Sequence, residues 1–186
     1  MKKTIIAVVV LMMLCIFTLS AQQAQDRAGI MLTHFAPRQF AAGAIPRADL
    51  DLIVQAGVRA PSANNSQPWH FTVVQNIDLA RRMVSQVVEG NVLIVVSTAR
   101  DTNTWDIIGC ALATESMYLT AQTLGHSSRI YTGPIAAINR DLKGELSLPA
   151  GHSAVTLVRV GKVDPSIDAR TAATPRKAAS EVVTYR

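Results

Sequence analysis

The sequence has very few cysteines, and this scarcity limits the disulfides that the protein can form. Only Cys15 and Cys110 occur among 186 residues. Cys15 lies in an N-terminal apolar stretch that we expect to be removed, so the mature chain cannot form an internal disulfide. A domain of this size can build its core without disulfides, so their absence does not argue against export. Cys110 lies within an apolar helical pattern, where a cysteine most often serves as inert packing.

Charged residues are also scarce, at 17% of the chain. Loss of Lys2 and Lys3 with the N-terminal segment lowers the formal net charge from +5 to +3. The basic residues form no cluster interleaved with aromatic residues, so the sequence predicts no nucleic-acid partner. His70, His126 and His152 are far apart with no paired spacing, so it also predicts no metal site.

The N-terminus has the pattern of an export signal. A basic head, Met1-Lys2-Lys3, precedes an apolar run over residues 5–19. This run is long for the core of a signal peptide and short for a membrane span. We therefore predict that residues 1–24 are a signal peptide cleaved between Ala21 and Ala24, and that the protein is periplasmic or otherwise extracytoplasmic. An uncleaved membrane anchor is the alternative, and it would be the protein's only contact with a membrane.

Residues 25–186 have the length of one domain, in which helical and strand patterns alternate. Apolar spacing and Pro, Gly and Asn punctuation predict helices over 26–35, 46–60, 78–88, 104–124 and 135–142. Short β-branched and aromatic runs predict strands over 69–74, 92–96, 127–131 and 153–160. Strands alternating with helices favour an α+β fold, in which a mixed β-sheet is flanked by helices on both faces.

The predicted helix over residues 104–124 is apolar almost all round. Glu115 is the only charge inside it, and Asp106 lies near its start. A helix that is apolar on all sides is normally buried on all sides. In a domain this small, we expect it to pack on the sheet and on a second subunit, which predicts a homodimer. A simple core helix is the alternative.

A polar loop between a predicted helix and a predicted strand, residues 61–68, is the strongest candidate for a binding site. Its Pro, Ser, Asn and Gln residues favour turns and crowd hydrogen-bond donors and acceptors together without formal charge. Such a surface suits a ligand that is recognised by hydrogen bonds, such as a heterocycle edge or ribityl hydroxyls. From chemistry alone, the loop could also be an ordinary connection.

The ordered pattern Pro61-Ser62-Ala63-x-Asn65-x-Gln67-Pro68-Trp69-x-Phe71 resembles the flavin-binding signature of the nitroreductase family, FMN-dependent oxidoreductases that act as homodimers. The resemblance extends over essentially the whole mature chain and implies a dimeric α/β sandwich. It implies that the ring and ribityl chain of FMN are bound by Pro61, Ser62, Ala63, Asn65 and Gln67. It also places Gly133 where the family's backbone approaches the flavin.

The same resemblance identifies a phosphate clamp. Arg38 and Arg176 match phosphate ligands of the family, with Lys177 as a helper, and guanidinium forks suit phosphate oxygens. The family's Arg-x-Ser-x-Arg/Lys-x-Phe pattern reads here as His34-Phe35-Ala36-Pro37-Arg38-Gln39-Phe40. His34 therefore replaces an arginine, and it contacts phosphate favourably only while protonated. Each missing contact is worth on the order of 1–3 kcal/mol if buried.

The resemblance implies that hydride passes from NADH or NADPH to FMN, and then to a nitroaromatic, a quinone or a similar small acceptor. The flavin carries this chemistry, so we predict no catalytic side chain. The main alternative is a degenerate nitroreductase-fold protein without redox activity, acting as an exported binding or interaction protein. A flavin enzyme of the same fold with other chemistry, such as dehalogenation or flavin fragmentation, is a weaker alternative.

Overall fold

The computed structural model of the chain describes residues 29–163 and 175–186. The chain divides into two compact units, residues 1–34 and 35–186. In the first, the described part is a short helix over residues 29–33. The predicted signal peptide, residues 1–24, lies outside the described residues. Of the helices that are described, none combines the length and the apolar character that crossing a membrane would require.

A four-stranded sheet forms the centre of the second unit, in the order β1-β2-β4-β3. Its strands are β1 (His70–Val74), β2 (Val92–Thr98), β3 (Ser127–Tyr131) and β4 (Ser153–Gly161). β2 is buried along its whole length, as its continuous apolar sequence predicts for a central strand. The bounds of β3 agree with the prediction, and those of the other strands differ by one or two residues.

Contrary to the prediction from the sequence, the described sheet is not mixed. All three strand pairs among the described residues are antiparallel. β2 and β3 run in the same direction, because both are antiparallel to β4, and the long helix α4 (Thr104–Thr123) joins them. These two strands do not pair, because β4 inserts between them and runs against both. The α+β class is confirmed.

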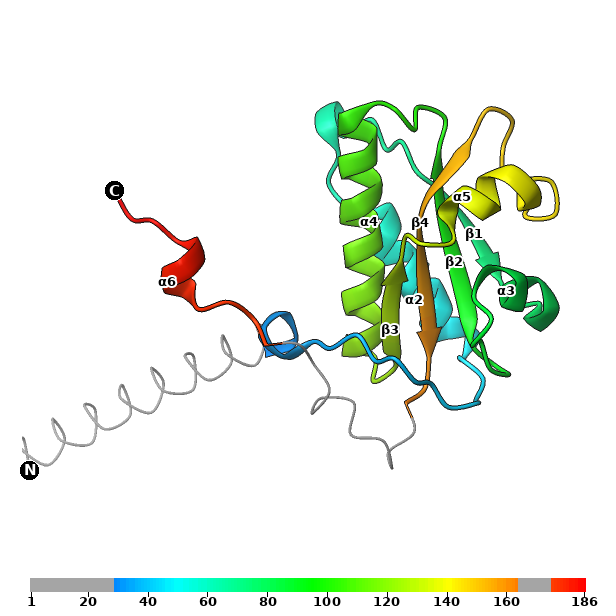
Figure 1. The fold of residues 1–186 in the computed structure, drawn as a ribbon, viewed down its shortest axis with the longest axis horizontal. Coiled ribbons are helices and arrows are strands. Elements are labelled where there is room, and N and C mark those ends of the chain that lie inside the picture. Colours follow the sequence, from blue (N-terminus) through cyan, green and yellow to red (C-terminus); the bar gives the residue numbers. More distant parts are fainter. Residues whose placement is uncertain (1–28, 164–174) are drawn as a thin grey trace, which may run out of the picture. The chain divides into compact units, whose positions relative to one another are not determined.

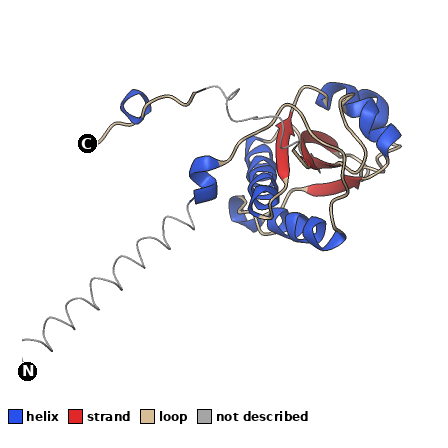
Figure 2. Ribbon diagram, turned by 90° about the horizontal axis from the view of Figure 1, so that it is seen from below, coloured by secondary structure: helices blue, strands red, loops and turns tan. Residues whose placement is uncertain are grey.

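Helices cover both faces of the sheet (Figures 1 and 2). On one face, α4 and α2 (Arg47–Val58) pack against each other and enclose a core with Ile94 and Val158. On the other face, a second core around Leu93 and Leu157 is covered by three short helices. These are α3 (Ile77–Met83), α5 (Ile135–Ala137) and η2 (Ile138–Leu142). α6 (Ala179–Val182) belongs to the C-terminal segment, residues 175–186.

The long helix α4 is not buried all round within one chain. Its inward face packs on the sheet through buried residues such as Cys110, Ala113 and Met117. Its other side carries exposed large apolar side chains: Trp105 is 65% exposed, Ile108 43% and Leu112 40%. The sequence therefore predicts the core face of this helix correctly, while the remaining apolar residues have no partner among the described residues.

Candidate functional site

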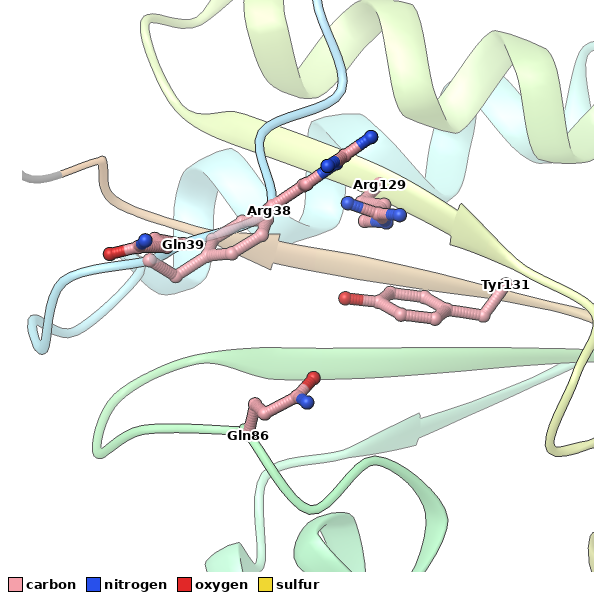
Figure 3. Close-up of a pocket in the computed structure, with 6 residues that line it drawn as sticks. Arg38, Gln39, Gln86, Arg129 and Tyr131 are labelled. Atoms are coloured by element: carbon pink, nitrogen blue, oxygen red, sulfur yellow. The ribbon is translucent and has the colours of Figure 1, made fainter. Parts of the chain in front are cut away.

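A cavity of about 450 Å³ opens beside the edge strand β3 and is rich in cationic and amide side chains (Figure 3). It lies on the sheet face that carries α3, within the size range of small-molecule sites. Three chain segments that are distant in sequence supply its walls: the segment before α2, the loop before β2, and β3. The lining residues are Arg38, Gln39, Phe40, Gln86, Arg129 and Tyr131.

Two arginines lie directly opposite each other beside this cavity. Arg129 of β3 pairs in register with Arg159 of β4, so their side chains share one face of the sheet. The guanidinium of Arg159 is buried, with 1% of the residue exposed, and lies over the ring of Phe40 at 4.0 Å from its centroid. Arg129 lies over the ring of Tyr131 at 5.4 Å and donates a hydrogen bond to the carbonyl of Pro37 at 3.1 Å.

The hydrogen-bond partners of Arg129 and Arg159 are neutral groups. Arg159 donates from both Nε and Nη2 to Oδ1 of Asn91, at 2.9 and 2.6 Å, and from Nη2 to the carbonyl of Gln86 at 2.9 Å. Burial lowers the pKa of Arg159, the hydroxyl of Tyr131 opposes this shift, and the charge of Arg129 adds to it. Among residues 29–163 and 175–186, no carboxylate lines the cavity or forms an ion pair with its arginines. The cavity is therefore positively charged.

The signature loop, residues 61–69, lies at the end of the sheet opposite to the cavity, and part of its backbone is strained. Asn64, Asn65 and Gln67 have positive φ angles of 51°, 54° and 44°. Asparagine tolerates this conformation, whereas it is uncommon for glutamine, and such strain clusters at ligand-binding sites. Ser62 stabilises the turn, because its Oγ accepts a hydrogen bond from the backbone N–H of Gln67 at 3.0 Å.

The loop packs on the first half of α4 through Gly109. A Cβ at this position would lie 3.1 Å from Cγ of Pro68 and 3.5 Å from Cβ of Ser62, so glycine permits the close approach. Asn65 and Gln67 remain exposed. The loop thus packs on the same part of α4 that carries the exposed side chains of Trp105 and Ile108.

The structure separates the predicted flavin ligands into two groups. Arg38 precedes Ala41, which bridges to Lys162 beyond the end of β4, whereas the signature loop leads into His70 at the other end of the sheet. The β2–β4 ladder between these ends spans six residue steps, about 20 Å at ~3.3 Å per residue. The side chains of the signature loop and Arg38 are therefore too far apart in one chain to contact one phosphate or one flavin ring edge.

The remaining predicted ligands lie outside this arrangement or at its border. His34 belongs to the first compact unit, and Arg176 and Lys177 are exposed residues of the C-terminal segment, beyond the undescribed residues 164–174. Gly133 follows β3 two residues after Tyr131, which lines the cavity. A Cβ at Gly133 would have no neighbour within 4 Å, so the chain's own packing does not require glycine there.

Sequence reasoning identified only one cavity residue, Arg38, as a ligand. Gln86, Arg129 and Tyr131 carry no motif, and they come together only through strand register and the position of the loop before β2. The histidines show the same effect. His70 and His152 are distant in sequence, yet their ring centroids lie 6.0 Å apart near the signature loop.

Comparisons with known proteins find the same resemblance. The family model described as "Nitroreductase family" matches residues 33–92. A relative from Archaeoglobus fulgidus, named as an NADH dehydrogenase/NAD(P)H nitroreductase, is 29% identical over 126 residues, which cover 61% of this chain and 71% of that protein.

Solved structures share the fold. An FMN-bound nitroreductase from Bacteroides fragilis superposes with a TM-score of 0.71 at 22% identity, covering 85% of this chain and 97% of that one. An FMN-dependent nitroreductase from Clostridium difficile gives a TM-score of 0.70 at 18% identity, covering 84% and 97%. The resemblance predicted from the signature loop is thereby confirmed: residues 33–92 match the family's model, and the fold is that of solved nitroreductases.

Proposed function

We propose that the protein is a homodimeric, FMN-dependent oxidoreductase whose flavin lies between the cationic cavity of one subunit and the signature loop of the other. The observation that carries this proposal is the cavity itself, which is lined by the arginines Arg38 and Arg129 and by no carboxylate of the described residues. FMN carries a terminal phosphate dianion, which such a site attracts strongly. When bound, the isoalloxazine ring supplies the hydride chemistry, and the protein supplies binding, orientation and access.

The residues of the cavity fit the rest of the cofactor as well as its phosphate. The amides of Gln39 and Gln86 offer both donors and acceptors, and the hydroxyl of Tyr131 points into the space between them (Figure 3). The aromatic ring of Phe40 adds an apolar wall.

The homodimer follows from two separate features of the chain. First, the signature loop and the cavity are too distant to act together within one subunit, so a second copy must supply the missing half. Second, the exposed apolar side of α4 adjoins the loop and includes Trp105, Ile108 and Leu112. Burying these side chains against a second copy would stabilise a dimer by ~25 cal/mol for each Å² removed from water.

In this proposal, NADH or NADPH reduces the flavin, and a small acceptor such as a nitroaromatic or a quinone is then reduced at the same face. The name of the Archaeoglobus fulgidus relative supports a nicotinamide donor without separating NADH from NADPH.

We further propose that residues 1–24 direct export, so that the enzyme acts outside the cytoplasm. N-terminal sequencing of protein from the extracytoplasmic fraction tests this, because an intact Met1 recovered only from membranes would indicate an anchor.

The decisive experiment is a titration of the mature chain with FMN, followed by flavin fluorescence and by the visible absorption spectrum. We expect saturable binding at micromolar FMN, and bleaching of the flavin absorption when NADH or NADPH is added without oxygen. Binding without bleaching by either nucleotide would contradict the oxidoreductase. No binding at all would instead support the non-redox binding protein, which the replacement of the family's arginine and serine by His34 and Ala36 favours.

A further inference from the structure

We propose that Arg129, which lies opposite the buried Arg159 across two strands, is the main anion-binding residue of the cavity and holds the phosphate of the cofactor. In this role it supplies a permanent positive charge to a clamp in which His34 stands where the family has an arginine. The inference rests on the proposed function for the identity of the ligand, but an anion site at Arg129 can be tested without FMN.

The first observation is the register of the two arginines. Arg129 and Arg159 are direct partners across the β3–β4 pair, on the same face of the sheet. Like charges that face each other across two strands destabilise a sheet. A cross-strand arginine pair beside a cavity is therefore costly for the empty protein, and the cost falls when an anion binds between or above the two charges.

The second observation is that Arg159 is fully buried and that no described carboxylate forms an ion pair with it. Charged side chains in protein interiors are normally paired with an opposite charge. Here Asn91, the carbonyl of Gln86 and the ring of Phe40 satisfy the hydrogen bonds and stack on the guanidinium, but they leave its charge in place. Arg159 is too deeply buried to contact a ligand, so we infer that it positions the cavity wall and raises the positive potential above it.

The third observation is the fixed position of Arg129. Its Nη1 donates to the carbonyl of Pro37, which lies next to Arg38 in the chain. This bond ties β3 to the segment that carries the second cavity arginine, and the other N–H groups of the Arg129 fork donate to no other described residue. Arg38 and Arg129 both line the cavity, so two guanidinium groups can bind the oxygens of one phosphate.

The test compares FMN with riboflavin, which lacks only the phosphate. We measure dissociation constants for the unaltered mature protein, for Arg129→Gln and for Arg47→Gln. The last variant is a matched control, since Arg47 is exposed on α2 and pairs with Asp51. We expect Arg129→Gln to weaken FMN binding roughly tenfold or more, the usual effect of losing a charged hydrogen bond, and to leave riboflavin binding nearly unchanged. Arg47→Gln should change neither constant.

A second measurement uses inorganic phosphate alone, so that the inference can be separated from the proposed function. Phosphate should raise the unfolding temperature of the unaltered protein and of Arg47→Gln, but not that of Arg129→Gln, because only a ligand bound to the native state stabilises it. If FMN fails to bind while phosphate still protects through Arg129, the proposed function fails and the anion site stands. If Arg129→Gln behaves as the unaltered protein with FMN and with phosphate, the inference is wrong.

Two further variants test the chemistry more finely. Arg129→Lys should recover part of the preference for FMN, because it restores charge without the planar fork. Arg159→Met should lower the ratio of FMN to riboflavin affinity, an effect that a merely structural role would not produce. An unchanged ratio would remove Arg159 from the site. Equal weakening of FMN and riboflavin by Arg129→Gln would place Arg129 at the ring and overturn the phosphate assignment.

Discussion

The signature loop, residues 61–69, and the cationic cavity differ in almost every physical respect. The loop is formally neutral, exposed and held in left-handed backbone conformations by local hydrogen bonds. The cavity is strongly positive, and residues from distant parts of the sequence meet in it through the sheet. In the site that we propose, one region recognises the cofactor by shape and hydrogen bonds, and the other by charge. A cofactor with a neutral ring system and an anionic phosphate requires both kinds of recognition.

The two regions also differ in how they depend on the rest of the protein. The loop needs only its own turn and the close approach to Gly109 of α4. The cavity needs the correct register of β3 and β4 and the support of Asn91 beneath Arg159. Their separation along the sheet means that the site we propose is completed only when two chains associate, so the loop of one subunit and the cavity of its partner should lose function together.

The largest effect should come from preventing that association. We expect Leu112→Glu, on the exposed apolar side of α4, to raise the dissociation constant of the dimer roughly a hundredfold or more. A carboxylate buried without a partner costs several kcal/mol, and about 1.4 kcal/mol corresponds to tenfold. Light scattering across a range of protein concentrations measures the effect.

Flavin affinity should fall with the loss of the dimer, even though Leu112 lines neither the cavity nor the signature loop. Ala137→Glu is the control. Ala137 is exposed on α5, so this substitution adds the same charge away from α4. An unaltered protein that is monomeric at every concentration, yet binds FMN, would contradict the two-subunit site.

The next largest effect concerns the support of the cavity. Asn91→Ala removes the acceptor of two hydrogen bonds from Arg159 and the donor to the carbonyl of Ala41. We expect the free energy of unfolding to fall by about 2–3 kcal/mol, because hydrogen bonds to a buried charge are among the stronger ones. Denaturant unfolding measures this loss.

Asn76→Ala provides the matched comparison, since Asn76 caps α3 on the protein surface and its loss should cost about 1 kcal/mol. Only Asn91→Ala should also weaken FMN binding, because Asn91 supports the buried Arg159 beside the cavity, whereas Asn76 caps α3. Equal stability losses in the two variants would show that the buried arginine does not depend on Asn91.

The sequence predicts one of these regions far better than the other, for a physical reason. The signature loop is local: nine consecutive residues determine its turn, and their chemistry is visible in the chain. The strands β3 and β4 are also visible locally, as short segments marked by Gly125 before β3 and by Gly161 at the end of β4. In contrast, Arg129 and Arg159 lie within strand patterns and are 30 residues apart by their numbers, so nothing in either segment marks them as neighbours. Only the antiparallel pairing brings them together.

The sheet topology shows the same limit. The helix between β2 and β3 indicates that these strands run in one direction, but no local signal reveals that β4, which comes later in the chain, inserts between them. Helix α3 ends at Met83, earlier than predicted, because Val84 adopts an extended conformation with φ of −136°.

Cys110, predicted to be inert, is indeed buried, and burial raises the pKa of its thiol to about 12.

A smaller effect should separate strain from recognition in the signature loop. Gln67→Gly relieves the left-handed conformation at φ 44° but increases the freedom of the unfolded chain. We expect the free energy of unfolding to change by less than about 1 kcal/mol, while FMN binding weakens several-fold through loss of the amide. Asn64→Gly is the control, because Asn64 has a similar φ of 51° and no ligand role in the family signature. If both variants bind FMN equally well, the Gln67 side chain is not a ligand.

The smallest effect is a pH dependence confined to the loop end of the sheet. His152 lies beside His70, and its Nδ1 is 3.3 Å from the hydroxyl oxygen of Ser97. Burial lowers the pKa of His152, and the charge of His70 lowers it further. The folded protein therefore binds this proton less readily than the unfolded chain does. The stability that the neutral form of His152 contributes is complete above the ordinary histidine pKa of ~6.5, and it is lost as the pH falls toward the lowered pKa of the folded protein.

We expect the unfolding temperature to decrease between about pH 7 and pH 5. His152→Gln should flatten this decrease, and His70→Gln should act in the same direction but less. The effect should be modest, because both rings are partly reached by solvent. Anion binding at the cavity should persist over the same range, because guanidinium groups remain charged. A decrease that is just as steep in His152→Gln would assign the acid sensitivity to another group and remove this contrast between the two ends of the sheet.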